Sequence, residues 1–238
     1  EQEYEHHITN VGNKNIQTTS FIGQGYYRTY CPSVIRRNIL ENPSWYTQYT
    51  PYQAEISQGR LEALFNFQTM ITELTQLPIA NASLLDEGNA CSEAIFMAFQ
   101  HNKGKKKTVV ICDDLFESSK NVILTRFKYL DIQFQFQSFD ALSIPKDCCA
   151  IIGQYPNKHG QLNDYTNIFK QAQSSGAVPI LATDLFCLTL NKTPKDMLAE
   201  IAVGSSQAFG VPLGFGGPSA AFISCKAMYT RLVPGRII

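Results

Sequence analysis

Residues 178–185 read Val-Pro-Ile-Leu-Ala-Thr-Asp-Leu, and residues 201–217 read Ile-Ala-Val-Gly-Ser-Ser-Gln-Ala-Phe-Gly-Val-Pro-Leu-Gly-Phe-Gly-Gly. The first segment predicts a short apolar strand that ends at a carboxylate, Asp184. The second predicts another strand that runs into a loop rich in serine and glycine, with a helical stretch between the two strands. In an open α/β sheet, ligands bind outside the carboxyl ends of the strands, which is where Asp184 and the loop are expected.

This layout resembles that of enzymes that depend on pyridoxal phosphate (PLP). In those enzymes an aspartate holds the protonated pyridine nitrogen, and a lysine in a later loop binds the cofactor covalently. The position where that lysine is expected holds Gln207 in this chain. The sequence therefore predicts a PLP-type fold whose own lysine is missing.

Strands and helices alternate along the middle of the chain, which predicts a mainly parallel sheet flanked by helices. The expected elements are a helix at 57–77, a helix at 88–101, a strand at 108–112, a helix at 116–129, strands at 132–136 and 149–153, and a helix at 162–173.

The N-terminal part of the chain is polar and carries one short predicted helix, at 33–41. We therefore divide the chain into an arm with its first helix, 1–44, and a large domain, 45–238. The sequence does not begin with methionine and stops at Ile238 shortly after a Pro-Gly pair. We expect it to be part of a longer protein, cut at both ends.

Composition excludes several classes of function. Twenty lysines and arginines balance twenty aspartates and glutamates, so no basic excess points to nucleic acid. The sequence contains no run of about 18 apolar residues, so it predicts no membrane span. The seven cysteines form no C-x-x-C pair and several lie in apolar runs, which indicates a reducing compartment without disulfides or a zinc site. The four histidines have no metal-binding spacing.

The segment from Trp45 to Glu55, Trp-Tyr-Thr-Gln-Tyr-Thr-Pro-Tyr-Gln-Ala-Glu, is dense in tyrosine and threonine without a helical or strand period. Tyrosine is favoured at interfaces because it covers area at little entropic cost, so the segment is consistent with a loop packed against another subunit. The alternative is a loop that presents hydroxyl and amide groups to a small polar ligand.

The small residues at 88–92 predict a helix start that could bind phosphate through free backbone N–H groups. Asp86 and Glu87 stand just before it, and carboxylates there repel phosphate while they stabilise the helix dipole themselves. A capped helix packed on the sheet is the other interpretation.

Several long motifs resemble one family, the glycine decarboxylases of the glycine cleavage system, known as P-proteins. The resemblance covers residues 20–238, and it implies the large domain of a PLP-dependent transferase (fold type I). The motifs are Ser20-Phe-Ile-Gly-Gln-Gly-Tyr-Tyr, Trp45-Tyr-Thr-Gln-Tyr-Thr-Pro-Tyr-Gln-Ala-Glu-Ile-Ser-Gln-Gly-Arg-Leu-Glu, Asn81-Ala-Ser-Leu-Leu-Asp-Glu-Gly, Gly204-Ser-Ser-Gln, Phe209-Gly-Val-Pro, Gly216-Gly-Pro and Pro234-Gly-Arg.

The family is built from two homologous halves, on one chain or on two subunits, and this sequence resembles the N-terminal half. The resemblance implies that the C-terminal half carries the lysine and binds PLP, in agreement with Gln207 here. It further implies decarboxylation of glycine with transfer of the aminomethyl group to a lipoylated carrier, the H-protein. The implied compartment is the mitochondrial matrix in a eukaryote and the cytoplasm in a bacterium.

The resemblance also assigns roles to residues, all of them supporting ones, with no catalytic residue in this segment. Arg60 is expected to pair with a carboxylate, either of the substrate or of the protein. Asp184 and Gln207 would be remnants of a PLP site. The residues expected to line the approach to the PLP of the other half are Tyr49, Thr50, Tyr52 and Gln53.

The chain departs from the family pattern at three places. Asn89-Ala-Cys-Ser stands where Thr-Ala-Ala-Ala is usual, Ala208 where arginine is usual, and Ser219 where histidine is usual. These departures keep a second hypothesis open, a non-catalytic homologue that serves as a structural subunit of a larger assembly. An aminotransferase that acts alone is a third hypothesis, but it would need a lysine at position 207.

Overall fold

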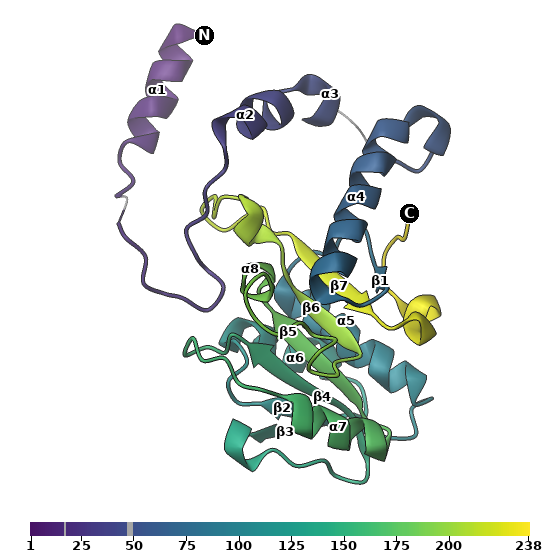
Figure 1. The fold of residues 1–238 in the computed structure, drawn as a ribbon. Helices are drawn as coiled ribbons and strands as arrows, with labels where there is room; N and C mark the ends of the chain where they lie inside the picture. The colour runs from purple at the N-terminus through teal and green to yellow at the C-terminus, as the bar shows by residue number, and fades with distance from the viewer. Residues whose placement is uncertain (17, 47–49) are drawn as a thin grey trace.

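The computed structural model describes residues 1–16, 18–46 and 50–238. Its centre is a seven-stranded sheet with the strand order β1-β7-β6-β5-β4-β2-β3 (Figure 1). The strands are β1 (Ile79–Ala80), β2 (Thr108–Cys112), β3 (Gln133–Gln137), β4 (Cys148–Tyr155), β5 (Val178–Thr183), β6 (Ile201–Ser205) and β7 (Ala221–Cys225).

Five of the strands, from β3 to β6 across the sheet, run parallel, whereas β7 runs antiparallel to both β6 and β1. The predicted mainly parallel sheet is thus confirmed, with β7 as the one antiparallel strand and β1 paired to it at the edge. The loop between β6 and β7 reverses the chain without a crossover helix, so β7 returns beside β6 in the opposite direction.

Helices cover both faces of the sheet, and successive strand residues point into two separate cores. In β2, Val109 and Ile111 pack in the core under α5 and α6, while Val110 packs in the core under α4 and α7. Burial of both faces explains why these strands are continuous apolar runs. The helices are α4 (Gln58–Thr75), α5 (Glu87–His101), α6 (Glu117–Phe127), α7 (Thr166–Ser175) and α8 (Leu185–Leu188).

The prediction of a helical stretch between β5 and β6 is largely wrong, because only the four residues of α8 are helical there. Beyond it, the Asp196 carboxylate accepts hydrogen bonds from the backbone N–H and the hydroxyl of Thr193, at 3.1 and 2.8 Å. Such local side-chain bonds offer the backbone an alternative to a helix. Short 3₁₀ turns complete the body: η2 (Ala54–Ile56), η3 (Phe139–Ala141), η4 (Gln207–Phe209) and η5 (Ala227–Leu232).

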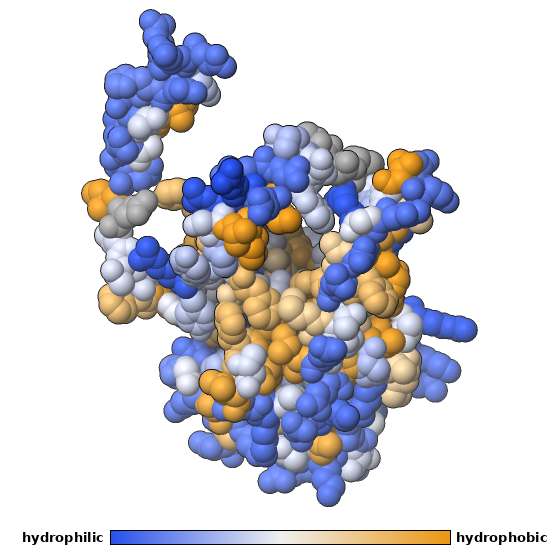
Figure 2. Space-filling view, turned by 45° about the horizontal axis from the view of Figure 1, so that its top comes forward, coloured by the Kyte–Doolittle hydropathy of each residue, from blue (hydrophilic) through white to orange (hydrophobic). Residues whose placement is uncertain are grey.

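The N-terminal arm lies outside this body. It contains α1 (Gln2–Gly12), α2 (Ser33–Ile35), which a π-helical turn η1 (Arg36–Leu40) continues, and α3 (Pro43–Tyr46). None of the described residues of 1–46 is buried, and α1 projects away from the sheet (Figure 1). Figure 2 shows apolar residues gathered around a hollow between the arm and the body. In the described ranges, no helix is long and apolar enough to cross a membrane.

Candidate functional site

A cavity of about 340 Å³ opens at the carboxyl ends of the central strands β4, β5 and β6. Gln154 reaches it from β4, Asp184 from the end of β5, and Gln207 from the turn after β6. The rule that ligands sit at strand ends therefore places the two predicted residues, Asp184 and Gln207, in one cavity.

The N-terminal arm supplies the outer wall. Tyr27 and Arg28 line the cavity, and the neighbouring Thr29 hydroxyl donates a hydrogen bond to the carbonyl oxygen of Val211, at 2.7 Å. This bond joins the arm to the glycine-rich loop across 182 residues of sequence. The arm thus depends on the loop for its position over the strand ends.

Asp184 and Gln207 are both held by their own backbone surroundings. The Asp184 carboxylate caps α8 by accepting a hydrogen bond from the backbone N–H of Cys187, at 3.1 Å. The backbone N–H of Gln207 donates to the Ser205 hydroxyl at 3.1 Å, and its side-chain amide lies 3.5 Å from the Pro212 carbonyl oxygen. Neither side chain is fully buried, so both can contact a molecule in the cavity.

Glu87, the first residue of α5, brings a second carboxyl group to the same cavity, beside that of Asp184. Burial raises its pKa from 4.5 to about 7, against a lowering effect of the hydrogen bond from Gln154, and the charges of Asp184 and Asp86 raise it further. Asp86, rather than Glu87, caps the helix by accepting from the backbone N–H of Asn89 at 2.7 Å. Glu87 is therefore partly buried beside the cavity, without the capping role.

The cavity residues do not fit covalently bound PLP. No lysine is among the residues that line it, and Gln207 offers an amide where an amine is needed. The start of α5, where a phosphate would find free N–H groups, faces the cavity with the Glu87 carboxylate. The interpretation of 88–92 as a capped helix start agrees with this geometry.

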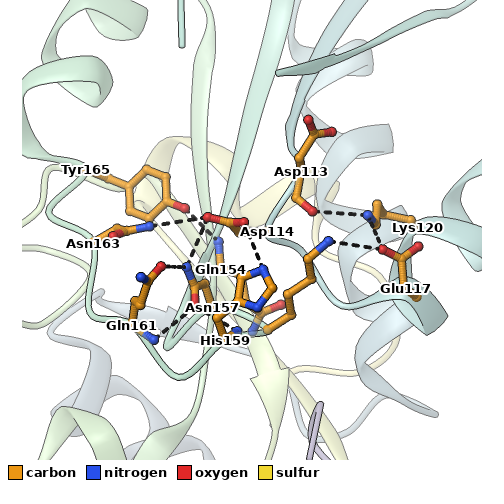
Figure 3. Close-up of polar contacts among 11 residues, drawn as sticks. Asp113, Asp114, Glu117, Lys120, Gln154, Asn157, His159, Gln161, Asn163 and Tyr165 are labelled. Carbon is orange, nitrogen blue, oxygen red and sulfur yellow. Dashed lines mark hydrogen bonds and ion pairs between the residues drawn. The ribbon is translucent and has the colours of Figure 1, made fainter. Parts of the chain in front are cut away.

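A hydrogen-bonded network supports the β4 side of the cavity (Figure 3). The Asp114 carboxylate accepts from the side-chain amide of Asn157 at 3.0 Å, and the side-chain oxygen of Asn157 accepts from the backbone N–H groups of His159 and Gln161, each at 2.9 Å. These bonds fix the loop after β4, whose first residue, Pro156, lines the cavity.

A second cluster in the same view fixes the start of α6 (Figure 3). The Lys120 ammonium lies 2.5 Å from the Glu117 carboxylate and donates to the carbonyl oxygen of Asp113 at 3.1 Å, while Lys158 approaches Glu117 at 3.4 Å. Phe116, which precedes α6, is another cavity wall. The network therefore serves to position the walls. Among the described residues, no group of three or more histidines, cysteines or carboxylates could hold a metal ion.

The described residues of the tyrosine- and threonine-rich loop do not line this cavity. Tyr49 falls outside the described residues, whereas Thr50, Tyr52 and Gln53 are exposed and do not line the cavity. Arg60, in the first turn of α4, is partly buried. The structure thus separates the predicted site residues into two groups, one in the cavity and one on the loop and α4.

The motifs of the resemblance meet in space. Pro51 is buried, and the guanidinium of Arg236 donates a hydrogen bond to its carbonyl oxygen. The buried side-chain amide of Asn81 donates a hydrogen bond to the carbonyl oxygen of Pro234, at 3.2 Å. The backbone N–H of Ala82 donates to the carbonyl oxygen of Arg236, at 2.8 Å. Pro234-Gly-Arg therefore links the loop at Pro51 to the 81–88 motif.

Two of the three departures from the family pattern, Ala208 and Ser219, lie on cavity walls. Ala208 lines the first cavity. Ser219 lines an adjoining cavity of about 550 Å³, which shares Glu87, Ser205 and Gln207 with the first. Small side chains at positions 208 and 219 thus leave space on either side of the glycine-rich loop.

Two cavity residues, Glu87 and Gln154, are not predicted from the sequence. Gln154 stands near the end of a predicted buried strand, so the strand-end rule contained a usable signal. Glu87 was interpreted only as a helix-dipole residue, because its place in the cavity depends on how α5 crosses the sheet. No local pattern carries that information.

Comparisons with known proteins support the resemblance. A family model described as glycine cleavage system P-protein matches residues 1–238. The mitochondrial glycine dehydrogenase (decarboxylating) of Flaveria anomala is 50% identical over 235 residues, which are 98% of this chain and 22% of that protein. The glycine dehydrogenase (decarboxylating) of Roseobacter denitrificans is 48% identical over 241 residues, which are 100% of this chain and 25% of that protein. The chain thus spans about a quarter of these relatives.

A crystal structure of glycine decarboxylase (P-protein) of the glycine cleavage system, in an inhibitor-bound form, superposes with a TM-score of 0.92 at 29% identity. The match covers 99% of this chain and 55% of that one. It confirms the predicted fold class, the large domain of a PLP-dependent transferase of fold type I. Because the family model matches the whole chain and these relatives share about half of its residues, the chain belongs to the glycine cleavage system P-protein family.

Proposed function

We propose that this chain is the half of a PLP-dependent glycine dehydrogenase (decarboxylating) that lacks the lysine. The observation that carries the proposal is the cavity at the strand ends, which keeps the PLP-type positions of Asp184 and Gln207 but offers no amine to the cofactor. The names of the relatives favour this enzyme over a purely structural subunit. The family and fold imply PLP, and we place it in a homologous second half.

In the complete enzyme, PLP supplies an electron sink for the loss of CO₂ from glycine. We assign this chain the task of closing the substrate approach with the loop from Tyr49 to Gln53. The burial of Pro51 and its bond from Arg236 support this role, because they hold the backbone while the neighbouring side chains stay exposed. Arg60 would pair with a carboxylate, of the substrate or of the protein.

The proposed partners follow from the same role. They are the homologous C-terminal half, as a second subunit or on the same chain, the lipoylated H-protein that receives the aminomethyl group, and glycine. We place the boundary between the arm and the large domain near residue 45. None of the described residues before it is buried, which supports this boundary. The proposed compartment is the mitochondrial matrix in a eukaryote and the cytoplasm in a bacterium.

Borohydride reduction of the complete enzyme loaded with PLP, followed by peptide mapping, tests the proposal. We expect the reduced cofactor on a single lysine of the homologous half and on none of residues 1–238. A specifically labelled lysine inside this chain, such as Lys226, would overturn the assignment of the non-lysine half. Labelling is a readout that does not depend on turnover, so it separates cofactor placement from activity.

A further inference from the structure

Two buried acceptor oxygens beside the strand-end cavity have no donor. Glu87 Oε1 and Gln154 Oε1 accept no hydrogen bond within the part of the chain that the structure describes, and neither atom contacts solvent. Both residues line the cavity, and Gln154 is 1% exposed. A buried acceptor without a partner costs free energy, so such groups call for a donor that the protein itself does not provide.

The charges around these oxygens favour a positive donor. Asp184 and Asp86 face Glu87 from the end of β5 and from the residue before α5, while Tyr27 and Cys91 are the uncharged titratable neighbours. Arg28 is the cation that lines the cavity, and its side chain belongs to an exposed residue of the arm. The inner part of the cavity is therefore negative, with a single positive group at the rim.

The other walls are aromatic. Phe116, Phe186 and Tyr27 line the cavity, and its volume of about 340 Å³ corresponds to roughly ten groups of the size of a water molecule. A bare inorganic cation would leave most of this space unfilled. An organic cation with an apolar body of a few carbon atoms would fill it.

We propose that the cavity of this half binds a small primary amine in its ammonium form, with the N–H groups directed at Glu87 and Gln154 and the apolar body against Phe116 and Phe186. This site is separate from the PLP site of the proposed second half. In this half, the amine would occupy the cavity that does not fit covalently bound PLP. An ammonium group supplies up to three donors, which suffices for both orphan oxygens and for Asp184.

Proton linkage gives the site a measurable signature. The Glu87 carboxyl, with a pKa of about 7, must lose its proton before it can pair with the ammonium. The dissociation constant should therefore fall about a hundredfold from pH 5 to pH 8, and most of that change should occur below pH 7. A simple amine stays protonated over this range, as lysine does.

The experiment is calorimetric titration of the complete protein with benzylammonium, after its PLP has been reduced onto the lysine with borohydride. We expect saturable binding to the wild type and at least tenfold weaker binding to Glu87→Gln, with the pH dependence lost. Glu93→Gln is the matched control, because Glu93 lies on the same helix but pairs with Arg126 outside the cavity. Benzyltrimethylammonium, which has no N–H group, should bind at least tenfold more weakly than benzylammonium.

Equal affinity for both cations, or equal affinity of wild type and Glu87→Gln, would overturn the proposal. If Glu87→Gln does not fold, the pH profile of the wild type decides alone, and a flat profile counts against the site. A structure of the complete protein with a lysine or arginine side chain of another segment in the cavity would also overturn it, because the donor would then be internal.

Discussion

At the scale of single residues, Glu87 is a carboxyl group whose surroundings disfavour its charged form and raise its pKa. A carboxyl whose pKa is higher in the folded than in the unfolded state binds its proton more tightly when folded. Its protonation therefore adds stability at low pH, and that stability is lost as the pH rises from 4.5 to about 7. Above that range the partly buried charge lowers the free energy of unfolding. Destabilising charges of this kind are common in binding sites.

We predict that Glu87→Gln stabilises the protein at pH 8 and has little effect at pH 4.5. The gain should reach about 3 kcal/mol, since the rise of the pKa from 4.5 to about 7 converts at about 1.4 kcal/mol for each pH unit. Thermal melts of both proteins between pH 4.5 and 8 measure it. A constant difference in melting temperature across this range would show that Glu87 is not buried as a charge.

Tyr52 carries the clearest prediction for the proposed activity. Its side chain is 71% exposed in this chain, while Pro51 beside it is buried and held by Arg236. A hydroxyl on a fixed backbone loses little entropy when it binds a small ligand. In the complete enzyme, Tyr52→Phe should lower the catalytic efficiency about tenfold or more, or about 1–2 kcal/mol, with little change in stability.

The measurement is the glycine-dependent exchange of CO₂ by the complete enzyme, with Tyr49→Phe as a companion variant. If both variants keep full activity, the loop contacts a partner surface and does not line the approach to the cofactor. In that case Tyr52→Ala should weaken assembly of the two halves, which sedimentation would detect.

At the scale of elements, Gly204 decides how closely β6 approaches β5. A Cβ atom at this position would lie 2.0 Å from the backbone oxygen of Thr183 and 2.9 Å from the ring of Phe222. Real Cβ atoms do not come so near, and a backbone oxygen inside a sheet cannot move aside. Ser205 ends β6 and Gln207 follows in η4, so this contact lies next to two residues that line the cavity.

We predict that Gly204→Ala destabilises the protein by about 3 kcal/mol or more, through overpacking that forces the strands apart. Gly59→Ala is the matched control, because a Cβ at Gly59, in the first turn of α4, meets no atom within 4 Å. It should be neutral or stabilise by about 0.5–1 kcal/mol. Urea unfolding of the two variants compares them, and equal stabilities would mean that β6 can shift without cost.

The elements also show what the sequence could and could not predict. Strands β2, β4 and β5 are continuous apolar runs buried on both faces, and their bounds were predicted within two residues. Strand β1 has two residues, and it exists only because β7 pairs with it, so no local pattern marks it. The stretch after α8 has helix-forming residues, but the hydrogen bonds from Thr193 to the Asp196 carboxylate stabilise a turn there in place of a helix.

The candidate site divides in the same way. Asp184 and Gln207 were predicted because both follow directly from strand ends in sequence. Glu87 and Gln154 meet only after α5 has packed across β4 and β6, a tertiary event that no spacing encodes. The hydrogen bond from Arg236 to Pro51 joins positions 185 residues apart, so no local sequence pattern predicts it.

At the scale of the whole molecule, the N-terminal arm is the feature that this chain alone does not explain. Its described residues include large apolar side chains with much of their surface in solvent, and none of them is buried. Figure 2 shows apolar residues on either side of the hollow beneath the arm. The most exposed are Phe21, Ile16, Tyr30, Ile22 and Tyr4.

Contiguous apolar surface of this kind marks an interaction site, and obligate interfaces are more hydrophobic than the rest of a protein surface. The chain also covers only 55% of the P-protein chain on which it superposes, which leaves room for a second body of similar size. We therefore expect the isolated segment 1–238 to associate or to be poorly soluble, because in the proposed enzyme the arm and the tyrosine-rich loop would pack against the homologous half.

Sedimentation velocity of isolated 1–238 over a hundredfold range of concentration measures this prediction. Removal of residues 1–44 is the informative second variant: if the arm causes association, the shortened segment should sediment as a smaller species that changes less with concentration. A stable monomer of full-length 1–238 over the whole range would contradict the prediction. The arm would then be a mobile extension of a self-sufficient domain, and the proposal that it buries itself against a homologous half would lose its main support.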